Sequence, residues 1–102
     1  MKGAIATVEI FAATKGASPE RLTLVVTAPE RDPSGGGWQC RIALANRQRP
    51  ETIPGEDSME ALSKALLRAA DWVAELRAEA RTLTRDRAGR VPFVFPLEAK
   101  AG

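Results

Sequence analysis

Few side chains in this sequence could carry out catalysis. The chain of 102 residues has no histidine and no tyrosine, so the usual general base near neutral pH is missing. Its single cysteine, Cys40, lies two positions from both Trp38 and Ile42, which places the thiol with them on one apolar strand face, where burial makes it unreactive. A lone cysteine forms no disulfide within the chain, and no zinc-type ligand cluster is available. We predict no enzymatic activity, no metal site and no cofactor.

Two short patterns have both a chemical and a structural interpretation. The paired carboxylates of Glu56 and Asp57 could bind a metal, but Asp57 is placed to cap a helix, and Glu60 follows at the capping-box position. The glycine-rich segment 33–37 could suggest a phosphate loop, but Trp38 and a strand follow it rather than Lys-Ser/Thr and a helix. We interpret the first as a helix start and the second as a hairpin loop.

Arginines gather late in the sequence, although the formal net charge is only +2. Arg77, Arg81 and Arg85 recur every four residues and would form one ridge on a helix. Cations near the C-terminal end of a helix favour its dipole, which is one explanation. The other is an acidic partner, protein or nucleic acid, bound by the ridge together with Arg87 and Arg90. Against nucleic acid stand the modest net charge and the lack of aromatic residues among these arginines.

The first half of the chain predicts an antiparallel sheet. Apolar residues alternate with polar or small ones over residues 5–12, 21–27 and 38–44, the pattern of half-buried strands. The connectors carry the glycine, proline and serine of turns, and short connections favour an antiparallel meander over residues 1–54. Two prolines in 47–54 restrict that segment to a short edge strand.

A long helix is predicted next, within residues 57–85 and running from about Ser58 to about Thr84. One expected apolar face comprises Met59, Leu62, Leu66, Ala69, Val73, Leu76, Ala80 and Leu83. A further arc of Leu67, Ala70, Ala74 and Ala78 makes the apolar surface wider than contact with one sheet requires. At 1.5 Å per residue such a helix would also overhang strands of about eight residues. We therefore expect a second covering surface, which is either the segment 91–97 of the same chain or another chain.

Residues 91–97 are apolar, with prolines on either side of Phe93 and Phe95. We therefore predict an extended edge segment at 90–97, followed by a flexible tail at 98–102. The predicted fold is a single α+β domain spanning 1–102. It has an antiparallel three- to four-stranded sheet, packed by one long C-terminal helix and followed by the extended edge segment.

The third strand, Trp38-Gln39-Cys40-Arg41-Ile42-Ala43-Leu44, is followed by a helix start that reads Gly55-Glu56-Asp57-Ser58-Met59-Glu60-Ala61-Leu62. Over roughly residues 4–70 this resembles a family of small bacterial domains of unknown function, in which a tryptophan-bearing strand precedes a Gly-x-Asp-Ser-x-x-Ala-Leu helix. The resemblance implies a fold and no activity. The arginine-rich helix end and the phenylalanine-rich segment depart from the family pattern.

The function predicted from these features is a non-enzymatic protein-binding module of bacterial or phage accessory type, comparable to an inhibitor or immunity protein. Its partner would be another protein or a second copy in a homodimer, and the alternative is an accessory nucleic-acid-binding protein that uses the arginine ridge. No apolar stretch approaches the ~20 residues that cross a bilayer, and with the lone cysteine we expect a cytoplasmic protein without membrane contact. The predicted binding residues are Leu67, Ala74, Arg77, Ala78, Arg81, Arg85, Phe93 and Phe95.

Overall fold

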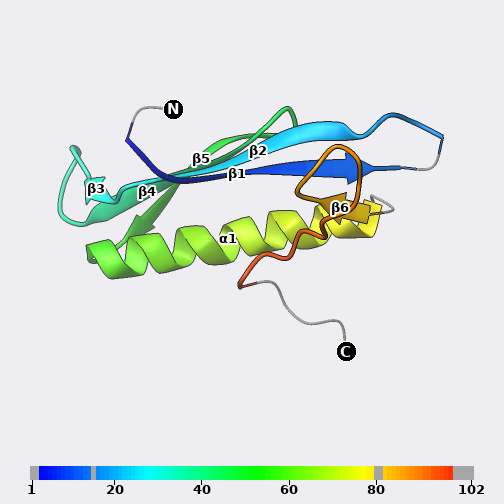
Figure 1. Ribbon diagram of the computed structural model, residues 1–102. Helices are drawn as coiled ribbons and strands as arrows, with labels where there is room; N and C mark the ends of the chain where they lie inside the picture. Colours follow the sequence, from blue (N-terminus) through cyan, green and yellow to red (C-terminus); the bar gives the residue numbers. More distant parts are fainter. Residues whose placement is uncertain (1–2, 15, 80–81, 98–102) are drawn as a thin grey trace.

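An antiparallel sheet and a helix form the body of the protein (Figure 1). The computed structural model describes residues 3–14, 16–79 and 82–97, and the predicted flexible tail at 98–102 lies outside them. In chain order the elements are β1 (Ala4–Ala13), β2 (Glu20–Thr27), β3 (Glu30–Arg31), β4 (Trp38–Ala45), β5 (Gln48–Gly55), α1 (Ser58–Glu79) and β6 (Thr82–Thr84). The α+β class is confirmed, but the described sheet has 6 strands where three or four were expected.

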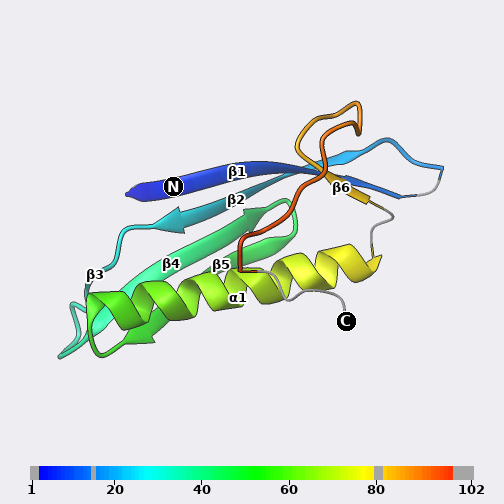
Figure 2. The same ribbon diagram turned by 60° about the horizontal axis from the view of Figure 1, so that its bottom comes forward.

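The long strands follow the predicted meander. β1, β2, β4 and β5 lie side by side in chain order, each antiparallel to its neighbour (Figure 2). The short β3 pairs with the start of β4, where Glu30 lies opposite Gln39. The short β6 returns to the far edge, where Leu83 lies opposite Ala12 of β1. The two extra strands are therefore short pieces added to a four-stranded meander.

The full length of β5 was not expected from its prolines. β5 covers 8 residues and pairs with β4 from Trp38↔Gly55 to Leu44↔Gln48. Within the described residues its other edge pairs with no strand. Proline is tolerated on an edge strand where the missing N–H would face solvent, so Pro50 and Pro54 are compatible with an edge position.

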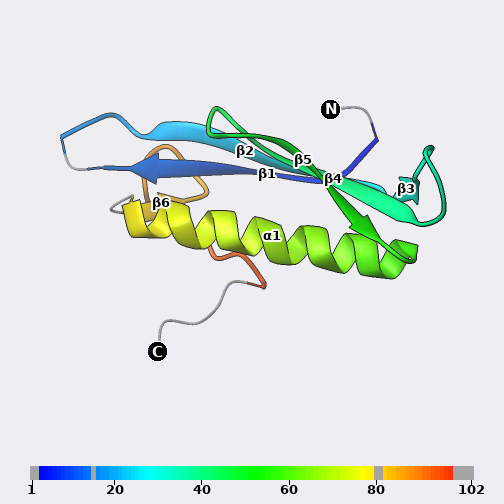
Figure 3. The ribbon, with the colours of Figure 1, turned by 180° about the vertical axis from the view of Figure 1, so that it is seen from behind.

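The helix lies on one side of the sheet, and in the described residues no helix covers the opposite side (Figures 1 and 3). We call the side toward α1 the inner face and the other side the outer face. Along that inner face α1 packs mainly against β4 and β5 and makes much less contact with β2. Inner-face side chains of β1 and β2 such as Ile10, Leu22 and Leu24 are nevertheless buried. Another segment must cover that half of the sheet.

The helix begins as predicted. The Asp57 carboxylate accepts the Glu60 backbone N–H at 2.7 Å, and the Glu60 carboxylate accepts the Glu56 N–H at 3.0 Å. This reciprocal pattern is a capping box in which the second bond goes to the residue before the cap. Gly55 is required here because a Cβ at that position would lie 2.4 Å from the Ala61 backbone nitrogen. The last residue of β5 and the first turn of α1 are therefore in close contact.

The helix face that packs on the sheet differs from the predicted one. Met59, expected in the core, is 72% exposed, and Leu62 and Leu66 are only half-buried. The buried positions of α1 are Ala61, Ala65, Ala69, Ala70, Trp72, Val73 and Leu76. Small alanine side chains in the first half of the helix allow its backbone to approach the sheet closely. Ala69, Val73 and Leu76 of the predicted face are buried as expected, whereas Ala61, Ala65 and Trp72 were not predicted.

The helix is also shorter than predicted. It ends at Glu79 in the described residues, and Thr82–Thr84 forms β6 instead of a further helical turn. Leu83 is buried, but as a strand residue beside β1. The free edge of β1 supplies hydrogen bonds that a helix ending in solvent would not have, and tertiary pairing of this kind overrides a helical pattern. Ala80 lies outside the described residues.

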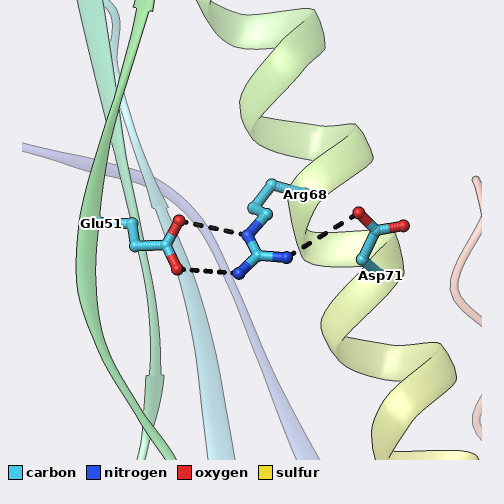
Figure 4. A network of polar contacts seen from close by, with 3 residues as sticks. All are labelled: Glu51, Arg68 and Asp71. Atoms are coloured by element: carbon cyan, nitrogen blue, oxygen red, sulfur yellow. Dashed lines mark hydrogen bonds and ion pairs between the residues drawn. The ribbon is translucent and has the colours of Figure 1, made fainter.

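One ion pair joins the helix to the edge of the sheet (Figure 4). The Arg68 guanidinium donates two hydrogen bonds, at 3.1 and 3.2 Å, to the two carboxylate oxygens of Glu51 on β5. Asp71 lies 3.9 Å from the same group, and the guanidinium also lies over the Trp72 ring at 5.7 Å. The hydrogen bonds that Arg68 donates to Glu51 raise the pKa of its guanidinium. The pair fixes the orientation of α1 against β5 and shields the buried indole.

Leu76 and Leu67 lie on different sides of α1 and test its orientation. Leu76 is 2% exposed and Leu67 is 58% exposed. Leu76→Ala should lower the free energy of unfolding by about 2–5 kcal/mol, because it leaves a cavity in the core. Leu67→Ala should change it by no more than about 0.5 kcal/mol. Urea denaturation of both variants measures this, and equal losses would show that the helix face is assigned incorrectly.

Candidate protein-binding site

The chain after the helix first joins the sheet as β6 and then folds back on itself. The Phe93 N–H donates to the Leu83 carbonyl at 3.0 Å, and the Arg85 N–H donates to the Val91 carbonyl at 2.8 Å. A β-bridge joins Thr84 to Pro92 between these bonds. The predicted extended segment is therefore paired with β6, and we call residues 91–97 the tail segment.

An aspartate holds the loop of this hairpin. The Asp86 carboxylate accepts the Val91 N–H at 2.8 Å and the Arg90 N–H at 3.0 Å. The bond from Val91 contributes most to lowering the pKa of Asp86. Gly89 has a φ of 77°, a left-handed conformation that glycine adopts without steric cost. The loop thus redirects the chain toward the inner face of the sheet.

The tail segment covers part of the inner face that α1 leaves open (Figure 2). Phe93 is 2% exposed and Phe95 is 9% exposed, and both belong to the main hydrophobic core. The Arg77 guanidinium donates to the Phe93 carbonyl at 2.9 Å, and the Arg85 guanidinium lies over the Phe93 ring at 5.5 Å. Phe93 and Phe95, predicted to contact a partner, are therefore buried within their own chain on the inner face of the sheet, and the segment folds back on the same chain.

The predicted binding residues do not form one surface. Leu67, Ala74 and Ala78 are exposed on α1, whereas Phe93 and Phe95 are buried. Arg85 lies after β6 and not on the helix, so it does not continue a helical ridge from Arg77. Arg81 lies outside the described residues. Arg87, assigned to the same basic group, lies with its guanidinium 5.2 Å from the centre of the Phe11 ring on the outer face.

Beside the tail segment the inner face remains open as an apolar groove of about 300 Å³, which we call the tail groove. Sheet, helix and tail segment all contribute to it. Its lining residues are Ala6, Thr7, Val8, Leu24, Val26, Leu66, Arg85, Phe93, Val94, Phe95 and Pro96. The groove reaches the edge of the sheet, since three consecutive residues of β1 line it.

Large apolar side chains are exposed next to this groove. Val94 is 63% exposed and Leu97 is 48% exposed. Neither residue is among the predicted binding residues, because the apolar run 91–97 has no polar position that separates its two sides. Successive side chains of an extended segment point to opposite sides. This alternation in Phe93-Val94-Phe95 is the signal that could have distinguished the exposed Val94 from the two buried phenylalanines.

The residues whose side chains could take part in chemistry have structural roles. Cys40 is 1% exposed, its Sγ lies 3.1 Å from the Thr27 carbonyl, and burial raises the pKa of its thiol. Asp32 accepts hydrogen bonds from the Ser34 amide and hydroxyl in the glycine-rich loop, which joins β3 to β4 as a hairpin. Among the described residues no three His, Cys, Asp or Glu side chains gather as metal ligands. No described helix is long and apolar enough to cross a membrane.

Comparisons of the chain with family models, with curated proteins and with solved structures gave no match. The similarity to a family of small bacterial domains therefore stays a prediction from sequence. Interpretation of the function depends on the tail groove and on the exposed side chains around it.

Phe93→Ala tests the structural role of the tail segment. It should lower the free energy of unfolding by about 3–5 kcal/mol, because the ring is fully packed between helix and sheet. Val94→Ala, at the neighbouring exposed position, should change it by no more than about 0.5 kcal/mol. Thermal and urea denaturation measure both. Equal, small effects would mean that the tail segment does not pack on the sheet in solution.

The Asp86 loop should respond to acid. Because its pKa is lowered in the folded state, the stabilisation is present above the ordinary aspartate value of about 3.9 and is lost as the pH falls through the lowered value. The amide signals of Arg90 and Val91 should shift in nuclear magnetic resonance spectra over this range. In Asp86→Asn they should not titrate, and the variant should be less stable than the wild type at pH 7. Identical titration in both chains would contradict this assignment.

Proposed function

We propose that this chain is a non-enzymatic protein-binding module, and that the tail groove receives an apolar segment of a partner protein. The observation that carries the proposal is the open apolar groove between the tail segment, the N-terminal half of β1 and the C-terminal half of β2. Concave, mainly apolar surfaces with few polar groups are the usual form of a binding site. The proposed binding surface is the groove and not the distal helix that the sequence predicted. The tail segment still belongs to the proposed binding surface, because residues 93–96 line the groove.

Three properties support binding rather than catalysis. The chain has no histidine or tyrosine, its thiol is buried with a raised pKa, and the Asp57 carboxylate caps the helix. Exposed Val94 and Leu97 beside the groove increase the apolar area that a partner would cover. An accessory role in a bacterium or phage, as an inhibitor or immunity-like protein, fits these properties and the resemblance of the sequence to small bacterial domains.

Nucleic-acid binding is the alternative function, and the geometry gives it less support. Arg77 and Arg85 bind the tail segment through the Phe93 carbonyl and the Phe93 ring. Arg47 pairs with Glu79 and Arg21 pairs with Glu9. Affinity for random duplex and single-stranded DNA at two salt concentrations tests this alternative, because contacts to phosphates cause a steep loss of affinity with salt.

Val94→Asp, with Met59→Asp as its control, tests the groove. Both positions are highly exposed, at 63% and 72%, so neither change should unfold the chain, but only Val94 lines the groove. A specific partner recovered from the source cell should bind the wild type and Met59→Asp alike and should bind Val94→Asp at least about tenfold more weakly, as expected when a charge must be buried. Equal affinities for all three chains would exclude the groove as the binding site.

A further inference from the structure

The N-terminal part of β1 has a free edge. β1 pairs with β2 along almost its whole length, but β6 pairs only with Phe11–Ala13 on the other side. Across residues 3–14, 16–79 and 82–97 no strand pairs with residues 4–10 on that side. Figure 2 shows this half of β1 at the border of the sheet, with no element alongside it.

The hydrogen-bond pattern identifies the backbone groups that face this edge. The Leu83 carbonyl accepts the Phe93 N–H, so the backbone groups of Leu83 point away from β1. The Ala12↔Leu83 pair is then the non-hydrogen-bonded type, and the adjacent Phe11↔Thr84 pair is hydrogen-bonded. The backbone groups of Phe11 therefore point toward the edge that β6 occupies. Since the backbone groups of successive residues point to alternate edges of a strand, the N–H and C=O groups of Thr7 and Glu9 point to the same edge, which is free at these residues.

This edge has few of the features that usually prevent association: its register against β2 shifts between Ala4 and Ala6 and is regular from Ala6 to Ala12. The other edge strand, β5, carries Pro50 and Pro54, whereas residues 4–10 contain no proline, lysine or arginine. Proteins commonly protect exposed edges with such residues. The one charge in this stretch, Glu9, is paired with Arg21 of β2 on the outer face. Residues 4–10 therefore carry no unpaired charge that would repel the same residues of a second copy.

We propose that the free edge of β1 binds β1 of a second copy of the chain, antiparallel and about a twofold axis at Thr7. Thr7 then lies opposite Thr7 of the second copy, and each N–H donates to the other's carbonyl. Glu9 lies opposite Ile5 of the second copy, at the irregularity of β1 between Ala4 and Ala6, so the Thr7 pair is the centre of the contact. An axis at Val8 would place Ile5 opposite Phe11, whose edge β6 already occupies.

The side chains suit this arrangement on both faces. On the inner face Ala6 lies opposite Val8 of the second copy, which joins the apolar tail grooves of the two chains across the seam. On the outer face Thr7 meets its own copy, and threonine pairs across strands are favourable. A single patch contacts itself, which is the isologous interface of a closed dimer. The proposal depends on the edge of β1 and does not require the partner of the proposed function.

Charge at Thr7 tests the proposal directly. Thr7 is exposed, so Thr7→Lys and Thr7→Glu should both fold. Sedimentation equilibrium should show a wild-type dimer, each variant alone should dissociate with a constant at least about fivefold higher, and an equimolar mixture of the two should dimerise at least as well as the wild type. Thr52→Lys, at an exposed position of β5 on the opposite edge, is the matched control and should not change the mass.

Thr7→Pro is a second variant that removes the edge N–H without removing a bond to β2. It should raise the dissociation constant about tenfold or more, because two hydrogen bonds are lost per dimer. A wild type that is monomeric up to about 1 mM, or a dimer unaffected by all three Thr7 changes, would overturn the proposal. A dimer that Thr7→Lys strengthens would also overturn it, since that result places Thr7 opposite Glu9.

Discussion

A single helix is too narrow to cover this sheet, and most of the structure follows from that mismatch. Neighbouring strands lie about 4.8 Å apart, and a helix with its side chains is about 10 Å across, so one helix covers about two strands. Here α1 lies over β4 and β5. The apolar inner face of β1 and β2 must be covered by something else, and the tail segment supplies Phe93 and Phe95 for that purpose.

The same mismatch explains the arginines near the end of the helix. An extended segment has no internal hydrogen bonds, so it needs partners where it crosses an apolar face. Arg77 binds the Phe93 carbonyl from α1, and Arg85 lies over the ring from the β6 side. Local positive charge thus holds a segment of the same chain. The open groove remains because one extended segment is narrower than the surface to be covered.

Much of the fold could be predicted from local patterns in the sequence. Alternation located three strands, and Asp57 with Glu60 located the helix start. The end of the helix could not be predicted, because Leu83 fits a helical apolar stripe and becomes a strand residue only through pairing with Ala12, 71 positions earlier. For the same reason the tail segment was recognised as extended, while the burial of Phe93 depends on a β1–β2 surface that no local pattern reveals.

The long sequence separation of these contacts has a consequence for synthesis of the protein. The ribosome makes β1 and β2 first, and adjacent strands can pair as they emerge. Their inner face stays bare until the phenylalanines, more than sixty residues later, leave the exit tunnel. During that interval the nascent chain exposes Ile10, Leu22 and Leu24 to other proteins. The β1–β2 pair is therefore open to chaperones, and to aggregation, until its own C-terminal segment covers it.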